Sequence, residues 1–207
     1  MFAPVLGLSP TSGPMRVWRH DILGMMKHFS AGLFLALAAW GQAPTSAWVP
    51  ADYVVPKVWK TSGYQLVPLS PAIVRQDYDA YMSSIEHLRK TFSDGRWPSP
   101  EITMADAMKD MESEESRFES RRSFAYGVLT LDGKKELGSV YVRPSRKAGY
   151  DAVVTMWVTK EMYDKGFENQ LFGDVKQWVS SSWPFAKVAY PGKEISKQEF
   201  AKLPDKK

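Results

Sequence analysis

The feature that most constrains the fold is an apolar run in the second half of the chain. It extends from Tyr150 to Thr159 and reads YDAVVTMWVT. Valine, threonine, tryptophan and tyrosine are enriched in strands. A strand whose middle residues are nearly all apolar is typically covered on both faces. The run therefore predicts a central strand with one layer of structure packed against each side.

Other strands are expected on both sides of this run. Residues 124–130 (FAYGVLT) and 137–142 (LGSVYV) have β character, and Asp132-Gly133 between them is a hairpin signal. Two shorter segments predict a first and a last strand, Tyr64–Leu69 (YQLVPL) and Phe185–Tyr190 (FAKVAY).

Three helices are expected between these strands. Ser70 and Pro71 form a helix start, and apolar residues follow at alternating spacings of four and three at Val74, Tyr78, Tyr81, Ile85, Leu88 and Phe92. Thr103 with Asp106 resembles a capping box at the start of a second helix. A third helix fits residues 167–179. The element order is β-α-α-β-β-β-α-β, which predicts an α/β (α+β) domain.

Composition excludes several kinds of function. The chain has no cysteine, so disulfides, thiolate nucleophiles and cysteine-bound metals are excluded. The formal net charge is +4 without a dense Lys/Arg block, so we expect no nucleic-acid partner. His87 is the only histidine after residue 47, which argues against a histidine-based metal site or triad. We interpret one acidic cluster as a solvated helix face and expect no metal: Glu112, Glu114, Glu115 and Glu119.

Positions 26–47 carry the marks of a secretory signal. A positive region at positions 27–28 precedes an apolar run at 29–40, and the small-residue stretch GQAPTSA ends at Ala47. The run is shorter than the roughly 20 apolar residues that span a bilayer comfortably. We expect an exported protein, periplasmic or secreted, with no stable membrane span after cleavage. The alternative is a buried N-terminal helix.

This interpretation divides the chain into four parts. Residues 1–47 are the N-terminal extension and signal peptide, and the stretch before Met25 suggests a start codon assigned too early. The three parts after them are an extended lead-in at 48–63, the folded domain at 64–192 and a C-terminal tail at 193–207.

The element order, together with three segments, resembles the GNAT acyltransferase superfamily. YQLVPLSPAIVRQDYDAYMSSI is similar to the family's opening strand and helix, ELGSVYV to its third strand, and AVVTMWV to the fourth strand, which carries the acyl-CoA site. The similarity covers Tyr64 to Tyr190. It implies a central mixed, mostly antiparallel sheet flanked by helices, with the fourth and fifth strands splayed apart.

The resemblance also implies a reaction and a donor site. The activity would be transfer of an acetyl or acyl group from acetyl-CoA to a small-molecule or peptide amine. Trp157 and Val158, on the fourth strand, would meet the pantetheine arm. The loop and helix start after this strand would meet the pyrophosphate, because a helix N-terminus attracts anions. These residues are Lys165, Gly166, Phe167 and Asn169.

The remaining site residues are expected on strands and on one loop. Tyr190 is a candidate proton donor, and Asp151 is a candidate base if burial raises its pKa. The acceptor would be bound by Trp97, in the loop between the first two helices, and by Tyr126 and Tyr141 on strands.

Two alternatives remain open on the sequence alone. Glu168 stands where the family pattern has a second small residue, and a carboxylate there repels a pyrophosphate. Only residues 196–207 follow the last strand, and export would separate the protein from cytoplasmic acyl-CoA. These features favour an exported, non-catalytic GNAT-fold protein that binds a ligand or partner. The early pair of helices also permits an NTF2-like fold.

Overall fold

The computed structural model describes residues 48–92 and 95–207. The predicted signal peptide and N-terminal extension, residues 1–47, lie outside this part. Within the described residues, no helix is both long enough and apolar enough to cross a membrane.

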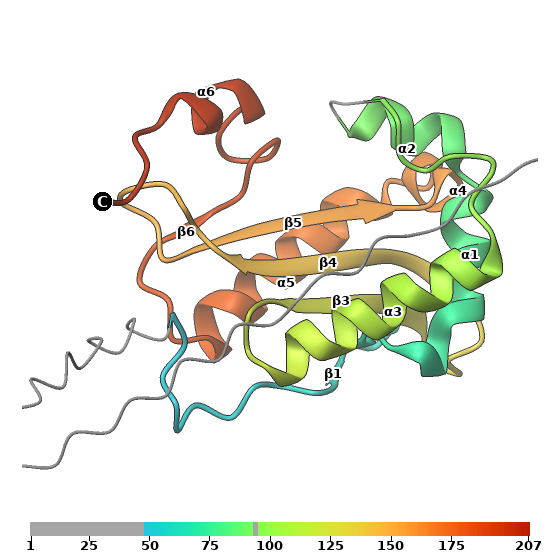
Figure 1. The fold of residues 1–207 in the computed structure, drawn as a ribbon, viewed down its shortest axis with the longest axis horizontal. Helices are drawn as coiled ribbons and strands as arrows, with labels where there is room; N and C mark the ends of the chain where they lie inside the picture. The colour runs from blue at the N-terminus through green and yellow to red at the C-terminus, as the bar shows by residue number, and fades with distance from the viewer. Residues whose placement is uncertain (1–47, 93–94) are drawn as a thin grey trace, which may run out of the picture. The chain divides into compact units, whose positions relative to one another are not determined.

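A six-stranded sheet forms the centre of the domain, and the order of its strands in space equals their order in the chain (Figure 1). The strands are β1 (Trp59–Lys60), β2 (Tyr64–Pro68), β3 (Phe124–Thr130), β4 (Glu136–Pro144), β5 (Ala152–Val158) and β6 (Val188–Ala189). The first five pair antiparallel, whereas β6 runs parallel to β5. The sheet is therefore mixed and mostly antiparallel, as the resemblance predicts.

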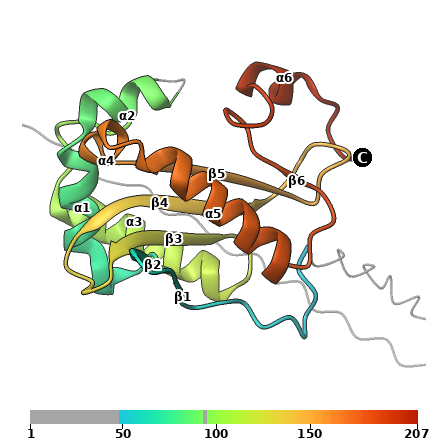
Figure 2. The same cartoon turned by 180° about the vertical axis from the view of Figure 1, so that it is seen from behind.

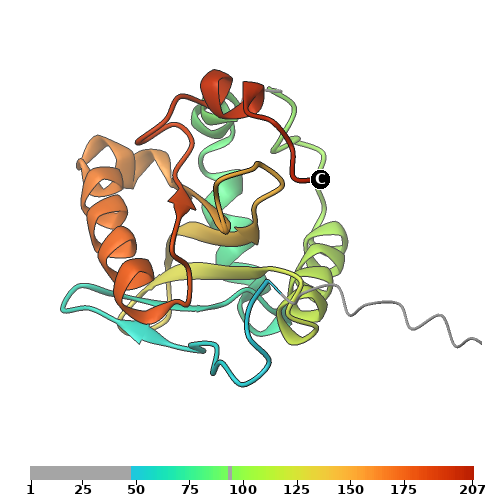
Figure 3. The same cartoon turned by 90° about the vertical axis from the view of Figure 1, so that its left-hand side faces the viewer.

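Helices cover both faces of this sheet. The elements are a 3₁₀ turn (Pro71–Ile73), α1 (Val74–Met82), α2 (Ile85–Thr91), α3 (Met104–Glu119), α4 (Lys160–Asp164), α5 (Phe167–Ser182) and α6 (Lys197–Lys202). Figures 2 and 3 show α5 on one face of the sheet and α3 on the other. Because α1 packs against β4 and α3, we call the second face the α1–α3 face.

A β-bulge in β4 decides which side chains reach each face. Gly138 lies opposite Val128 and Glu136 lies opposite Leu129, so Leu137 is an extra residue in the ladder. Leu137 packs in the core under α5. The bulge therefore brings Glu136 to the α1–α3 face, the same face as Ser139, whose hydroxyl donates to it.

The pairing of β5 with β6 ends early. Only Ala152 and Val153 pair with β6, opposite Val188 and Ala189. Beyond them, residues 154–158 have no strand partner on that side among the described residues. The two strands therefore splay, which is the arrangement expected of the GNAT fold and excludes the NTF2-like alternative.

The structure corrects one helix prediction. Residues 71–92 form a 3₁₀ turn and two helices instead of one continuous helix, and the break falls at Ser83 and Ser84. The Ser83 hydroxyl donates to the carbonyl of Ala80, and the Ser84 hydroxyl accepts from the amide of Lys160. Serine side chains that bond to backbone groups in this way compete with helix continuation.

The last strand is also shorter than predicted. It covers Val188–Ala189 rather than residues 185–190. The carboxylate of Asp151 accepts hydrogen bonds from the amides of Ala186 and Lys187, both at 2.8 Å. These amides are therefore directed to a side chain instead of a strand ladder.

Candidate functional site

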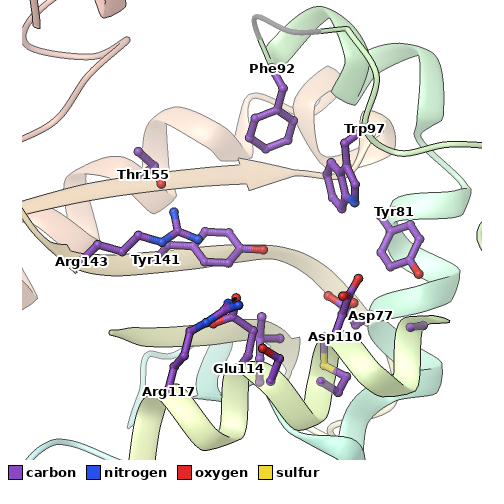
Figure 4. A pocket seen from close by; sticks show the side chains of 14 residues that line it. Asp77, Tyr81, Phe92, Trp97, Asp110, Glu114, Arg117, Tyr141, Arg143 and Thr155 are labelled. Atoms are coloured by element: carbon purple, nitrogen blue, oxygen red, sulfur yellow. Dashed lines mark hydrogen bonds and ion pairs between the residues drawn. The ribbon is translucent and has the colours of Figure 1, made fainter. Parts of the chain in front are cut away.

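A cavity of about 610 Å³ lies on the α1–α3 face. Side chains from α1, α3, β4, β5 and the loop between α2 and α3 line it, and we call it the α1–α3 pocket (Figure 4). The aromatic and charged side chains that give the pocket its chemistry are Asp77, Tyr81, Trp97, Asp110, Tyr141 and Arg143.

Aromatic rings form one wall of the pocket. The ring of Trp97 lies 5.4 Å from that of Tyr81, 5.2 Å from that of Phe92 and 6.0 Å from that of Trp157. Trp157 is buried behind this wall, and its indole Nε1 donates to the hydroxyl of Tyr141 at 3.4 Å. The fold thus brings together three predicted site residues, Trp97, Tyr141 and Trp157.

Two buried carboxyl groups meet beside the pocket. Asp77 projects from α1 and is 4% exposed, and Glu136 projects from the bulged end of β4 and is 1% exposed. Gly127 on β3 makes room for this contact, because a Cβ atom there would lie 2.8 Å from Cδ1 of Ile73 and 3.1 Å from Oε2 of Glu136. Oε1 of Glu136 accepts from the Ser139 hydroxyl at 2.8 Å. Within the described residues, Oε2 has no hydrogen-bond partner.

Burial changes the pKa of both acids. It raises the pKa of Glu136 well above the usual value, and the neighbouring charge of Asp77 adds to this effect. Burial also raises the pKa of Asp77, to about 7, although the polar neighbour Glu136 acts in the opposite direction. Glu136 therefore keeps the proton of the pair, and Asp77 titrates near neutral pH.

This pair predicts a pH dependence of stability. A carboxyl group whose pKa is higher in the folded state contributes stability that is complete below its unfolded pKa and is lost as the pH rises through its folded pKa. For Asp77 this window runs from the ordinary value of 3.8 to about 7. We expect the urea midpoint of the wild type to decline across this window, and that of Asp77→Asn to decline less steeply. Parallel declines in the two proteins would contradict the assignment.

The opposite end of the pocket carries arginines. The guanidinium of Arg117 pairs with the carboxylate of Glu114 at 2.5 Å within α3. The guanidinium of Arg143 lies 4.3 Å from the centre of the Tyr141 ring.

Three other predicted residues lie away from the pocket. Tyr126 is buried on the α5 face, and its hydroxyl donates to the carbonyl of Pro56 at 2.8 Å. Tyr190 packs in the same core, where burial raises its pKa to about 12. Asp151 holds the backbone that enters β6. In the structure, Tyr126 and Tyr190 pack in the core, and Asp151 binds backbone amides.

The predicted donor residues extend from the end of β5 to the first turn of α5. The backbone of Val158 hydrogen-bonds the imidazole of His87, and the Lys165 amine pairs with Glu161 at 2.6 Å. Gly166 is the N-cap of α5, with φ of 74°. Phe167 packs in the core against Tyr64, and Asn169 lies in the first turn of α5.

The two halves of a coenzyme A molecule fit this region differently. The unpaired edge of β5 at residues 154–158 suits the amide groups of a pantetheine arm. The first turn of α5 does not suit a pyrophosphate, because it holds the carboxylate of Glu168, which pairs with Lys193 at 3.0 Å. Both side chains are about four-fifths buried, so the pair fills the start of α5, where the resemblance would place the phosphates.

Asp77, Glu136 and Arg143 were not identified from the sequence. A signal for Asp77 was present, because it stands between Val74 and Tyr78 on the apolar side of a predicted amphipathic helix. The described residues contain no group of three or more acidic or histidine side chains that could hold a metal.

Several solved structures that are similar to this chain are named as acetyltransferases. A putative ribosomal-protein-serine acetyltransferase from Vibrio cholerae matches 70% of this chain and 79% of its own, at 10% identity and a TM-score of 0.51. The ribosomal-protein-S5-alanine acetyltransferase from Vibrio fischeri matches 59% of this chain and 66% of its own, at 13% identity and a TM-score of 0.47. A putative GNAT-family acetyltransferase from Bordetella pertussis matches 61% of this chain and 74% of its own, at 15% identity and a TM-score of 0.42.

Comparisons of sequence give a different result. No protein-family model matches the chain, and no curated protein matches it. The likeness is therefore one of fold, and it agrees with the splayed β5 and β6 strands and with helices on both faces of a mostly antiparallel sheet. The chain shares its fold with the putative acetyltransferase from Vibrio cholerae, in agreement with the fold that the GNAT resemblance implies.

Proposed function

We propose that this protein transfers an acyl group to an amine bound in the α1–α3 pocket. The observation that carries the proposal is the position of Asp77. It is a buried carboxylate that titrates near neutral pH and lines a cavity of the right size for a small molecule. The Vibrio cholerae protein of related fold is an acetyltransferase by name, which supports the same class of reaction.

The pocket suits a protonated amine as it arrives from water. Asp77 and Asp110 give one end of the cavity negative charge. The faces of the neighbouring rings of Tyr81 and Trp97 add cation–π attraction for an ammonium group. An amine is therefore attracted in its charged form, which is the form that cannot attack an acyl carbon.

Asp77 then provides the deprotonation that the reaction requires. Its pKa of about 7 matches the working pH of most enzymes, which is the best value for a general base. The carboxylate accepts a proton from the ammonium group and leaves the neutral amine, whose nitrogen can bond to the acyl carbon of a thioester donor. As that bond forms, the bond from the acyl carbon to sulfur would break, and the donor would leave as its thiol with the second proton from the nitrogen. Glu136 stays protonated behind Asp77, so the ionised form of Asp77 has a neutral group and not a second negative charge as its neighbour.

A second candidate function rests on the ion pair at α5. Because Glu168 and Lys193 occupy the expected pyrophosphate position, the protein could bind an amine without acting on it. This is the non-catalytic alternative that the sequence already favours at Glu168.

Calorimetric titration of acetyl-CoA into the purified protein tests the donor site. We expect Glu168→Gly to bind at least about tenfold more tightly than the wild type, because it removes both the charge and the side chain from the helix start. Glu168→Gln is the matched control, since it removes the charge but keeps the volume. Equal affinities in all three proteins would show that Glu168 does not obstruct the donor.

Mass spectrometry of an amine panel incubated with acetyl-CoA separates the two functions. Acylated product from the wild type would establish the transferase. Amine binding without product in the wild type and in Glu168→Gly would establish the non-catalytic alternative.

A further inference from the structure

The α1–α3 pocket has an acidic end and a basic end. Asp77 and Asp110 lie at one end, close enough for Asp110 to raise the pKa of Asp77. Arg143 lies toward the other end, and Tyr141 stands between the two (Figure 4). Burial raises the pKa of the Tyr141 hydroxyl; Asp77 raises it further, and Arg143 lowers it.

The geometry of β4 explains this arrangement. Alternate residues of a strand point to one face and recur about every 7 Å. Ser139, Tyr141 and Arg143 therefore form a row on the pocket face, with Glu136 added at its start by the bulge. One strand thus places a carboxyl group, an aromatic ring and a guanidinium in sequence along the α1–α3 face.

Arg143 is the arginine that remains open to a ligand. Its guanidinium stacks on the Tyr141 ring, which holds it over the pocket. In the part of the chain that the structure describes, no carboxylate pairs with Arg143, whereas Arg117 is engaged by Glu114. A guanidinium presents a planar set of donors that matches a carboxylate in bidentate geometry. Thr155, directly across the β4–β5 ladder from Tyr141, adds a hydroxyl to the same end of the lining.

We infer that the acceptor is a zwitterion of the amino-acid type, with its ammonium group at Asp77 and its carboxylate at Arg143. This inference rests on the proposed function, because it assigns the substrate class of the same pocket. The aromatic wall of Tyr81 and Trp97 would contact the apolar part of the ligand between or beside its charges. Simple amines would enter the acidic end but leave the guanidinium without a partner.

The test compares ligands that differ only in the carboxylate. Each member of an amino-acid panel is titrated into the full-length protein beside the amine that lacks its carboxylate, for example L-phenylalanine beside 2-phenylethylamine. We expect the wild type to bind the amino acid about tenfold more tightly than the matching amine. This is the size of effect that a charge-assisted hydrogen-bond pair contributes. Arg143→Gln should lose this preference and keep its affinity for the amine. Arg146→Gln is the matched control, because it removes the same charge from an exposed residue outside the pocket lining.

The outcomes separate this inference from the proposed function. Equal binding of amino acid and amine by the wild type would overturn the inference and leave the amine site standing. A preference that survives in Arg143→Gln would also overturn it. If neither class of ligand binds, both proposals fail.

Discussion

Replacing Gly138 with alanine is expected to lower the free energy of unfolding by about 3 kcal/mol. A Cβ atom at this position would lie 2.1 Å from the carbonyl oxygen of Trp157 and 2.7 Å from the Cα of Val158. Both are backbone atoms of β5, so no side chain can rotate to relieve the contact. β4 and β5 must separate locally, and the bulge that directs Glu136 to the pocket face lies at this point.

Urea unfolding of Gly138→Ala, monitored by tryptophan fluorescence, measures this effect. The matched control is Gly173→Ala, since Gly173 is exposed within α5 and an added Cβ there would meet nothing within 4 Å. Alanine at an exposed helix position favours the helix by about 0.5–1 kcal/mol, so this variant should be at least as stable as the wild type. A Gly138→Ala protein as stable as its control would contradict the described approach of β4 to β5.

Asp77→Asn is expected to reduce the rate of acyl transfer by about 10²- to 10⁴-fold, the usual contribution of a general base. Asparagine keeps the shape of the side chain but cannot accept a proton from the ammonium group. The wild-type rate should rise with pH through about 7, where Asp77 loses its proton. The variant should lose this rise.

Stability distinguishes this loss from misfolding. Because an ionised Asp77 is buried beside Glu136, the uncharged variant should be more stable than the wild type at pH 8. Asp79→Asn is the matched control, since Asp79 lies on the same helix, is exposed and pairs only with Arg75 among the described residues. Its activity should remain within about twofold of the wild type, in keeping with the small effect of surface changes. Equal activity in Asp77→Asn and Asp79→Asn would exclude Asp77 as the base.

Local signals in the sequence predicted much of the fold. The start of α3 is confirmed at Thr103, where the two bonds of the capping box are present: the amide of Asp106 donates to the Thr103 hydroxyl at 3.2 Å, and the amide of Thr103 donates to the Asp106 carboxylate at 3.1 Å. The two-stranded hairpin around Asp132-Gly133 is confirmed as well. Both features depend on residues that are close together in the chain, so a short stretch of sequence is enough to predict each of them.

Features that depend on distant contacts could not be predicted in the same way. The break between α1 and α2 follows from a hydrogen bond between Ser84 and Lys160, which are far apart in sequence. The position of Glu136 depends on one extra residue at Leu137, and strict alternation would have placed that side chain on the α5 face. The buried pair of Asp77 and Glu136 therefore depends on the shift in register between β3 and β4. By contrast, the unusual Glu168 was visible in the sequence, and the structure adds its partner Lys193.

The shortness of the two outermost strands has a consequence for behaviour in solution. β1 and β6 contain two residues each, so neither rim of the sheet offers the long row of unpaired amides and carbonyls on which another chain could align. The longer open edge, at residues 154–158 of β5, lies inside the domain, where the imidazole of His87 contacts its end at Val158. A second copy of the chain would find little backbone with which to extend the sheet. The fold thus combines one open strand edge with outer rims that resist sheet-to-sheet aggregation.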